Sequence, residues 1–349
     1  ADMLFRSTFP KAEYDKEKQV VEEENIRDKN DEARINYELF CRIAYAGNSF
    51  MYPVDTLEYH TKKNDWTLKQ VREWYRHYYQ PQHMVFSVVS SLPFRQILSL
   101  VEKTEFAKKS IAGSQPETKL GLRFPKRFSH SSTSSRDLLS RMVCQKKKGM
   151  TNTHIMLGYP SYDQYDPRRF CMRLVSQLLN GMSGRLFMQL REKTPLTYRS
   201  FSEIEYEEFG GHFVFVVECS NANVFRYQKS KPGVIPVLID IVESLCKKGI
   251  TQKELDFAKS QMRNANLMRF EDIDSFCDHN GRFHLVYDSD TTFVTFDQFY
   301  EKVYKPITLR EVNACIRDVF AIDKCIVTMV SNDPPSVKTI EKEVEKFLG

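Results

Sequence analysis

The chain has 349 residues, of which 41% are hydrophobic and 28% charged, and its formal net charge is +5 at pH 7. This composition is typical of a folded protein and argues against a disordered chain. No apolar run approaches the roughly 20 residues of a membrane-spanning helix, so we expect no insertion into a membrane. The mild net charge favours no nucleic-acid partner.

The eight cysteines are scattered along the chain and include no Cys-x-x-Cys pair. This spacing indicates free thiols rather than a disulfide framework or a thiolate zinc site. We therefore expect an intracellular, reducing compartment, which is the cytoplasm or, as the alternative, the mitochondrial matrix.

The first distinctive stretch, "YDKEKQVVEEENI" over 14–26, predicts an acidic helix. Glu17 and Glu24 are seven residues apart and therefore share one helix face, with two valines between them. A charge run on a helix is usually a solvated face, which suits the remaining glutamates. A carboxylate on an apolar stripe is costly to desolvate unless a cation or a donor meets it. The sequence thus leaves a solvated and a functional interpretation open for these two residues.

An internal repeat organises the chain. "TLKQVREWYRHYYQPQHMVFSVVSS" starts at Thr67 and aligns without a gap with "TLREVNACIRDVFAIDKCIVTMVSN" from Thr308, at an offset of 308 − 67 = 241. Each copy predicts an amphipathic helix followed by a strand. We therefore predict an α+β fold made of two homologous units, each a mixed or antiparallel sheet packed with helices.

The repeat also bears on the two glutamates. The offset of 241 places Glu17 on Ala258 and Glu24 on Ala265. A small apolar residue fits both places in the second copy, so the fold itself does not require a carboxylate there. This comparison strengthens the functional interpretation of Glu17 and Glu24.

The domain boundaries follow from composition and from the repeat. We expect residues 1–106 to belong to the first unit, 107–150 to be a linker and 151–349 to form the second unit. The linker contains the Ser-rich "FSHSSTSSRD" and the basic "CQKKKGM". The second copy begins near His154, whose counterpart falls at 154 − 241 = −87, so we expect about 90 residues of the first unit to be absent.

Three segments resemble a known family. "EKQVVEEE", "YELFCRIAYAGNSFMYPVDTLE" and the repeat from Thr67 are similar to the first domain of the pitrilysin/insulinase (inverzincin) zinc metallopeptidases, in the two-domain processing-peptidase branch. "LGYPSYDQYDPRRFCMRLVSQLLNGMSGRLFMQLREKTPLTYRSFSEI" resembles the second domain of that branch. The resemblance covers nearly the whole chain except the linker, and the second-domain stretch is its most specific part.

The resemblance implies a zinc site to which this chain contributes one ligand. In the family a His-x-x-Glu-His motif supplies two zinc-binding histidines and a general base, and a downstream glutamate is the third ligand. Glu24 matches that ligand, and Glu17 matches the supporting acid seven residues before it. None of the eight histidines of this sequence lies in such a motif. We therefore expect Zn²⁺ in a longer parent protein and no activity from this chain alone.

The resemblance also implies two substrate-binding residues. "RLFMQLREKTPLTYRSF" predicts a helix to about Lys193, a turn at 194–195 and a strand from about Thr197. Arg191 and Tyr198 match family residues that bind the substrate backbone and stabilise the tetrahedral oxyanion. The alternative is that Arg191 is a solvated cation at a helix end and Tyr198 a half-buried strand residue.

Two functions remain in competition. The first is a zinc endopeptidase of the processing-peptidase type that cleaves peptides or unfolded presequence-like segments, working as a homodimer or as a heterodimer with a related chain. The alternative is a non-catalytic partner subunit of a peptidase pair or an assembly protein, because fold does not settle function. The joint presence of Glu17, Glu24, Arg191 and Tyr198 favours the catalytic parent.

Overall fold

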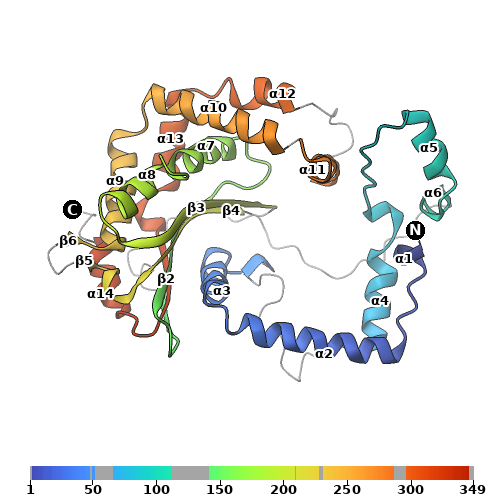
Figure 1. Cartoon of the computed structure of the whole chain (residues 1–349), viewed down its shortest axis with the longest axis horizontal. Coiled ribbons are helices and arrows are strands. Elements are labelled where there is room, and N and C mark those ends of the chain that lie inside the picture. Colours follow the sequence, from blue (N-terminus) through green and yellow to red (C-terminus); the bar gives the residue numbers. More distant parts are fainter. Residues whose placement is uncertain are drawn as a thin grey trace. The chain divides into compact units, whose positions relative to one another are not determined.

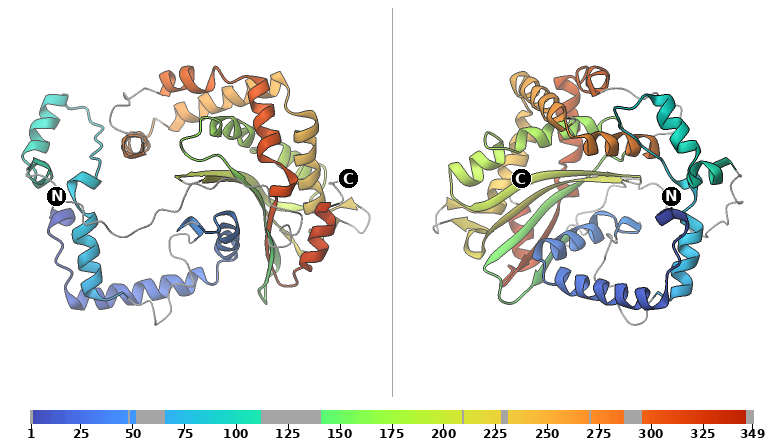
Figure 2. Two further views of the ribbon diagram at one scale, coloured as in Figure 1. Left: turned by 180° about the vertical axis from the view of Figure 1, so that it is seen from behind. Right: turned by 45° about the vertical axis from the view of Figure 1, so that its right-hand side comes forward.

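The structure is a computed structural model, drawn in Figures 1 and 2. It describes residues 2–47, 49–51, 66–111, 141–208, 210–227, 231–269, 271–286 and 296–345. The chain forms two compact units, which are treated separately below. Unit 1 comprises Ala1–Ile26, Leu57–Phe124 and Asn264–Gln298, and unit 2 comprises Arg27–Thr56, Pro125–Arg263 and Phe299–Gly349.

Unit 2 is built on a mixed five-stranded sheet in the order β1-β7-β2-β4-β3. Strand β1 is parallel to β7, and the other neighbours are antiparallel. The predicted α+β class with a mixed sheet is confirmed for this unit. The five strands are β1 (Met142–Lys146), β2 (Asn152–Ser161), β3 (Thr197–Glu207), β4 (Gly210–Ser220) and β7 (Ile326–Ser331), and a separate ribbon pairs β5 (Arg226–Tyr227) with β6 (Lys231–Pro232).

Helices cover both faces of this sheet. Helices α7 (Arg169–Leu179), α9 (Val234–Lys248) and α13 (Leu309–Val319) lie on one face, and α3 (Glu32–Ala44) lies on the other (Figure 1). All six residues of β7 are buried, as expected for a strand that is covered on both sides. The remaining elements with most of their residues in this unit are η1 (Ser49–Met51), α8 (Arg185–Phe187), η6 (Met188–Glu192), η7 (Asn221–Asn223), α10 (Gln252–Arg269), η8 (Tyr300–Tyr304), η9 (Ile322–Lys324) and α14 (Val337–Glu345).

The packing of α3 on the sheet depends on one aromatic residue. Phe40 is fully buried and forms a small core with Met156, Val214 and Ile326, separate from the main core on the other face. A Cβ atom at Gly158 would lie 2.6 Å from the Phe40 ring. Glycine is therefore required in β2 at this point, because it lets the ring approach the strand backbone.

His212 on β4 is enclosed beneath α3. Its imidazole is 1% exposed, Tyr45 Oη lies 2.7 Å from its Nδ1, and the Phe40 ring meets it edge-on with centroids 5.0 Å apart. Burial lowers the pKa of His212 to about 4, because the charged imidazolium loses its hydration. The imidazole is therefore neutral in the folded unit at neutral pH.

This burial predicts a loss of stability in mild acid. The unfolded chain has an ordinary histidine pKa of about 6.5, so between pH 6.5 and 4 the unfolded state takes up a proton that the folded state does not. Stability therefore falls as the pH is lowered, and linkage puts the loss at roughly 2 to 3 kcal/mol at pH 4.5 relative to pH 7.5. Urea unfolding at both pH values measures it. A His212→Gln variant should lose less, and an equal loss in both proteins would contradict the assignment.

Unit 1 has a different character. Its described elements are helical: α1 (Asp2–Phe5), most of α2 (Lys11–Asp28), α4 (Leu68–Tyr78), η3 (Pro81–His83), α5 (Phe94–Glu102), α6 (Glu105–Ile111), α11 (Ile273–Val286) and most of α12 (Phe296–Phe299). Among its described side chains only Asn25 and Pro81 are buried. Large apolar side chains such as Phe86 and Phe94 are 59% and 74% exposed. The described part of unit 1 therefore lacks a hydrophobic core of its own.

The helices of the predicted repeat are confirmed. Helix α4 follows Thr67 and α13 follows Thr308, and in both the threonine caps the helix in a capping box with the third residue of the helix. Both helices have 11 residues and are related by the offset of 241. The same offset relates α2 to α10, each of 18 residues.

The predicted strand of the first copy is not formed. Residues 85–90, the counterparts of β7, carry no strand in the structure, and Val85, Phe86 and Val88 are exposed. A strand is stabilised by hydrogen bonds to a neighbouring strand, and the described residues of unit 1 offer none. The prediction of a sheet in each unit is therefore wrong for the described part of unit 1, and a second homologous sheet unit is not seen.

The predicted linker is partly ordered. Residues 142–146 form β1, which pairs with β7, and residues 105–111 form α6. Most of the remainder, 112–140, lies outside the described residues. All eight cysteines are free thiols. Within the described ranges, no helix is both long and apolar enough to cross a membrane.

Candidate functional site

Glu17 and Glu24 lie in unit 1 on helix α2, and both carboxylates are exposed. The valines between them, Val20 and Val21, are 46% and 42% exposed. The predicted helix is thus present, and its face with the two glutamates is open in the described part of unit 1. Ala258, the counterpart of Glu17, is fully buried in α10.

The described residues do not form a zinc site by themselves. Across the described part of the chain, no three His, Cys, Asp or Glu side chains lie close enough together to hold a metal ion. A catalytic zinc needs three protein ligands and one open position. Glu24 is the one ligand that the sequence comparison predicts in this chain, so the donor set is incomplete. We derive no chemical step through a metal from these residues.

Arg191 lies in unit 2 in a turn of π-helix. The predicted helix ends close to the expected position: α8 continues into η6, and the Lys193 N–H donates to the Met188 carbonyl oxygen at 3.0 Å, an i→i+5 bond. The Arg191 side chain is exposed, and its guanidinium lies 5.4 Å from the centroid of the Phe187 ring. Single π-turns are rare and occur frequently at functional sites.

Tyr198 is the extra residue of a β-bulge. Thr197 faces Cys219 and Arg199 faces Glu218, so Tyr198 has no partner residue on β4. A bulge redirects a side chain away from the regular alternation of the strand. Tyr198 is 82% exposed, which excludes the half-buried tyrosine of the alternative interpretation. The strand begins at Thr197, as predicted.

A tight turn and an asparagine fix the elements around this pair. In the segment "NGMSGRLF" a Cβ at Gly184 would lie 2.3 Å from the Asn180 carbonyl oxygen, so only glycine fits. Asn180 in turn grips β3: its Oδ1 accepts from the Ser202 N–H at 2.7 Å, and its Nδ2 donates to the Ser202 carbonyl oxygen at 2.8 Å. The end of α7 is thereby fastened to the strand that carries Tyr198.

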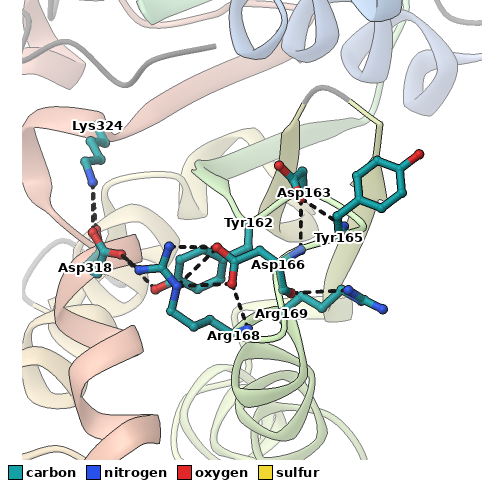
Figure 3. A network of polar contacts seen from close by, with 8 residues as sticks. All are labelled: Tyr162, Asp163, Tyr165, Asp166, Arg168, Arg169, Asp318 and Lys324. Atoms are coloured by element: carbon teal, nitrogen blue, oxygen red, sulfur yellow. Dashed lines mark hydrogen bonds and ion pairs between the residues drawn. The ribbon is translucent and has the colours of Figure 1, made fainter. Parts of the chain in front are cut away.

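The other end of α7 is held by a polar network (Figure 3). Tyr162 Oη donates to Asp318 Oδ2 at 2.8 Å, and the Arg168 guanidinium lies 4.4 Å from the centroid of the Tyr162 ring. Burial alone would raise the pKa of Asp318, but the Tyr162 hydrogen bond and the charges of Lys324 and Arg168 outweigh it and lower that pKa. The network joins the start of α7 to α13 and has a structural role.

Two features of the site could not be predicted from the sequence. The π-turn at Arg191 and the bulge at Tyr198 are departures from regular structure, and neither contains a glycine that would mark it. One signal for the bulge is Thr197, whose hydroxyl contacts the backbone of Arg199, the residue after the bulge, and the Glu218 carbonyl oxygen on β4. The structure places Arg191 and Tyr198 on either side of one turn in unit 2, whereas Glu17 and Glu24 belong to unit 1.

The chain is similar in sequence to a known protein family and to several named proteins. The family model described as "Peptidase M16 inactive domain" matches residues 65–262. The uncharacterized zinc protease YmxG of Bacillus subtilis is 28% identical over 327 residues, which cover 93% of this chain and 72% of YmxG. The zinc protease PqqE of Helicobacter pylori is 26% identical over 248 residues, which cover 70% of this chain and 51% of PqqE.

Solved structures share the fold. A protease from Helicobacter pylori superposes with a TM-score of 0.74 at 20% identity, covering 93% of this chain and 73% of the protease. A chain of complex III2 from Candida albicans superposes with a TM-score of 0.68 at 12% identity, covering 98% and 76% of the two chains. At these identities the likeness concerns the fold alone.

The sheet and its exposed arginine–tyrosine turn therefore belong to an α+β domain shared with proteins named zinc proteases. The chain belongs to the peptidase M16 family, the pitrilysin-like peptidases. The part that matches the family model is of the inactive-domain type, and the resemblance to the pitrilysin-like family is confirmed.

Proposed function

We propose that this chain is part of a zinc endopeptidase of the processing-peptidase type, which cleaves peptides or unfolded presequence-like segments. The observation that carries the proposal is the bulge that turns Tyr198 into solvent beside the π-turn of Arg191. The Tyr198 side chain is therefore accessible to a substrate chain. Two relatives of this chain, YmxG and PqqE, are named zinc proteases, which supports peptide hydrolysis as the reaction class.

Arg191 and Tyr198 supply the donors that peptide hydrolysis requires. When water attacks a peptide carbonyl, negative charge develops on the carbonyl oxygen, and donors aimed at that charge lower the barrier. A guanidinium and a phenol are such donors, and the guanidinium also grips peptide carbonyl groups. In the proposed enzyme Arg191 holds the substrate backbone and Tyr198 donates to the developing oxyanion.

The proposal includes completion of unit 1 by further polypeptide. Helix α11 already lies on residues 84–90: Ser87 Oγ donates to the Cys277 carbonyl oxygen at 2.8 Å. In unit 2 the corresponding helix α3 lies on β7. Residues 84–90 therefore have the covering helix of a sheet strand but no described neighbouring strand. We propose that strands outside this chain pair with them and cover the exposed apolar side chains of unit 1.

The same completion would bring the zinc ligands that this chain lacks. We propose that Glu24 is one ligand, that a His-x-x-Glu-His segment supplies the other two, and that Glu17 supports the site. An exposed face of α2 with glutamates seven residues apart suits this assignment, because it is free to receive a second element.

A second function is favoured by one observation. The matched family model describes the inactive domain, and a partner subunit needs no zinc ligands. In that case the chain would pair with a related, catalytic chain and capture peptides for it. The catalytic function remains our proposal because Arg191 and Tyr198 are both presented to solvent.

The test is a Tyr198→Phe substitution in the longer parent protein. Removal of one oxyanion donor lowers kcat by about 10²- to 10³-fold, and we expect that loss with unchanged zinc content. Peptide turnover and metal analysis measure both quantities. Tyr165→Phe is the matched control, because Tyr165 is also exposed in unit 2 but lies outside the turn. An unchanged kcat in Tyr198→Phe would refute the role of Tyr198.

A further inference from the structure

The β-bulge at Tyr198 is held by the side chain that precedes it. The Thr197 hydroxyl lies 2.7 Å from the Arg199 carbonyl oxygen, accepts a hydrogen bond from the Arg199 N–H at 3.1 Å, and also contacts the Glu218 carbonyl oxygen. Thr197 itself is buried. The Thr197 hydroxyl thus contacts both Arg199, the residue after the bulge, and Glu218, which pairs with Arg199 on β4.

We propose that Thr197 is a positioning residue, whose hydroxyl locks the bulge and so sets the direction of the Tyr198 side chain. The inference rests on the proposed function only for the consequence in catalysis. Its structural content, the orientation of Tyr198, concerns this chain alone.

The bulge is trapped between two fixed points of β3. On one side Thr197 keeps register with Cys219, which is fully buried. On the other side Ser202 is held by both of its backbone hydrogen bonds to Asn180. A one-residue slip between these points would move every side chain of the slipped stretch to the opposite face. The extra residue therefore cannot be absorbed by sliding the strand.

With register fixed at both points, the Thr197 hydroxyl determines how the extra residue is accommodated. An extra residue leaves backbone groups without ladder partners, and the hydroxyl supplies a partner to the Arg199 N–H and to the Glu218 carbonyl. Valine has nearly the same shape without the hydroxyl, so Thr197→Val removes both of these contacts. Serine keeps the hydroxyl. Tyr198 should lose its fixed direction in the valine variant and keep it in the serine variant.

The first experiment uses this chain. Amide hydrogen exchange reports the bulge, because loss of one buried hydrogen bond accelerates local exchange by about tenfold. We expect Thr197→Val to accelerate exchange at Arg199 by about that factor, and Thr197→Ser to restore it. Thr153→Val is the matched control: Thr153 is a buried threonine of β2, and its hydroxyl bonds to Asn221 and Ser331. Unchanged exchange at Arg199 in Thr197→Val, or an equal acceleration there in Thr153→Val, would overturn the proposal.

The second experiment uses the longer parent. Misplacement of a catalytic group by about 1 Å costs up to about 10²-fold in rate, so Thr197→Val should lower kcat by about 10- to 100-fold with little change in KM, and serine should rescue it. A change in KM with an unchanged kcat, or a low kcat that serine does not restore, would overturn the positioning role. The proposed function and the role of Thr197 can be refuted separately. An unaffected kcat in Tyr198→Phe would refute the proposed function, whereas the exchange rate at Arg199 does not depend on turnover.

Discussion

Glu24→Gln in the longer parent protein should abolish stoichiometric zinc and, with it, peptide hydrolysis. Loss even of a residue that only supports a ligand typically costs 10- to 100-fold in metal affinity, and loss of a ligand should cost more. The fold should survive, because the Glu24 carboxylate is exposed on α2 and its counterpart in the second copy is an alanine. Metal analysis after dialysis, together with circular dichroism, measures both outcomes.

The same helix offers controls for this result. Glu22→Gln and Glu23→Gln change the same charge on exposed positions of α2 and should leave zinc and turnover unchanged. Glu17→Gln should lower turnover and weaken zinc binding by about 10- to 100-fold, which is less than the loss expected for Glu24→Gln. Full zinc content and full activity in Glu24→Gln would refute the ligand assignment.

Phe40→Ala should produce a large loss of stability in unit 2. The Phe40 ring is fully buried against Met156, Val214 and Ile326, and it contacts the His212 imidazole edge-on. Truncation of a buried phenylalanine to alanine typically costs 3 to 5 kcal/mol, because it removes apolar contacts and leaves a cavity. Guanidinium unfolding monitored by circular dichroism gives the free energy.

The control for Phe40 is a phenylalanine that contributes little to packing in this chain. Phe94 on α5 is 74% exposed, and Phe94→Ala should change the free energy of unfolding by no more than about 0.5 kcal/mol. If Phe40→Ala destabilised the chain as little as Phe94→Ala, α3 would not be docked on the sheet through this contact.

Sequence reasoning was most successful where the signals are local. The helices after Thr67 and Thr308 begin at their capping threonines, which contact residues only three positions away. Such caps form wherever the pattern occurs. The helix before the turn and the strand from Thr197 were likewise predicted close to their observed bounds.

Features that depend on distant residues could not be predicted. Residues 85–90 have the β-branched pattern of β7, but a strand also needs a neighbour, and none is described for them. The bulge at Tyr198 depends on residues that are distant from it in the sequence. Thr197 pairs with Cys219 on β4, and Ser202 is held by Asn180 at the end of α7. The roles of Arg191 and Tyr198 came from the family resemblance, and the structure adds their exposure and their irregular backbone. Whether Glu17 and Glu24 meet a metal remains a prediction.

We propose that this chain completes a zinc peptidase together with polypeptide outside it. The zinc content of the longer parent and of the 349-residue chain, each purified under identical conditions, can be measured by mass spectrometry. We expect about one zinc per molecule of the parent and no stoichiometric zinc in the chain alone. A parent that contains no zinc and still cleaves peptides, or a 349-residue chain that binds a full equivalent by itself, would contradict it.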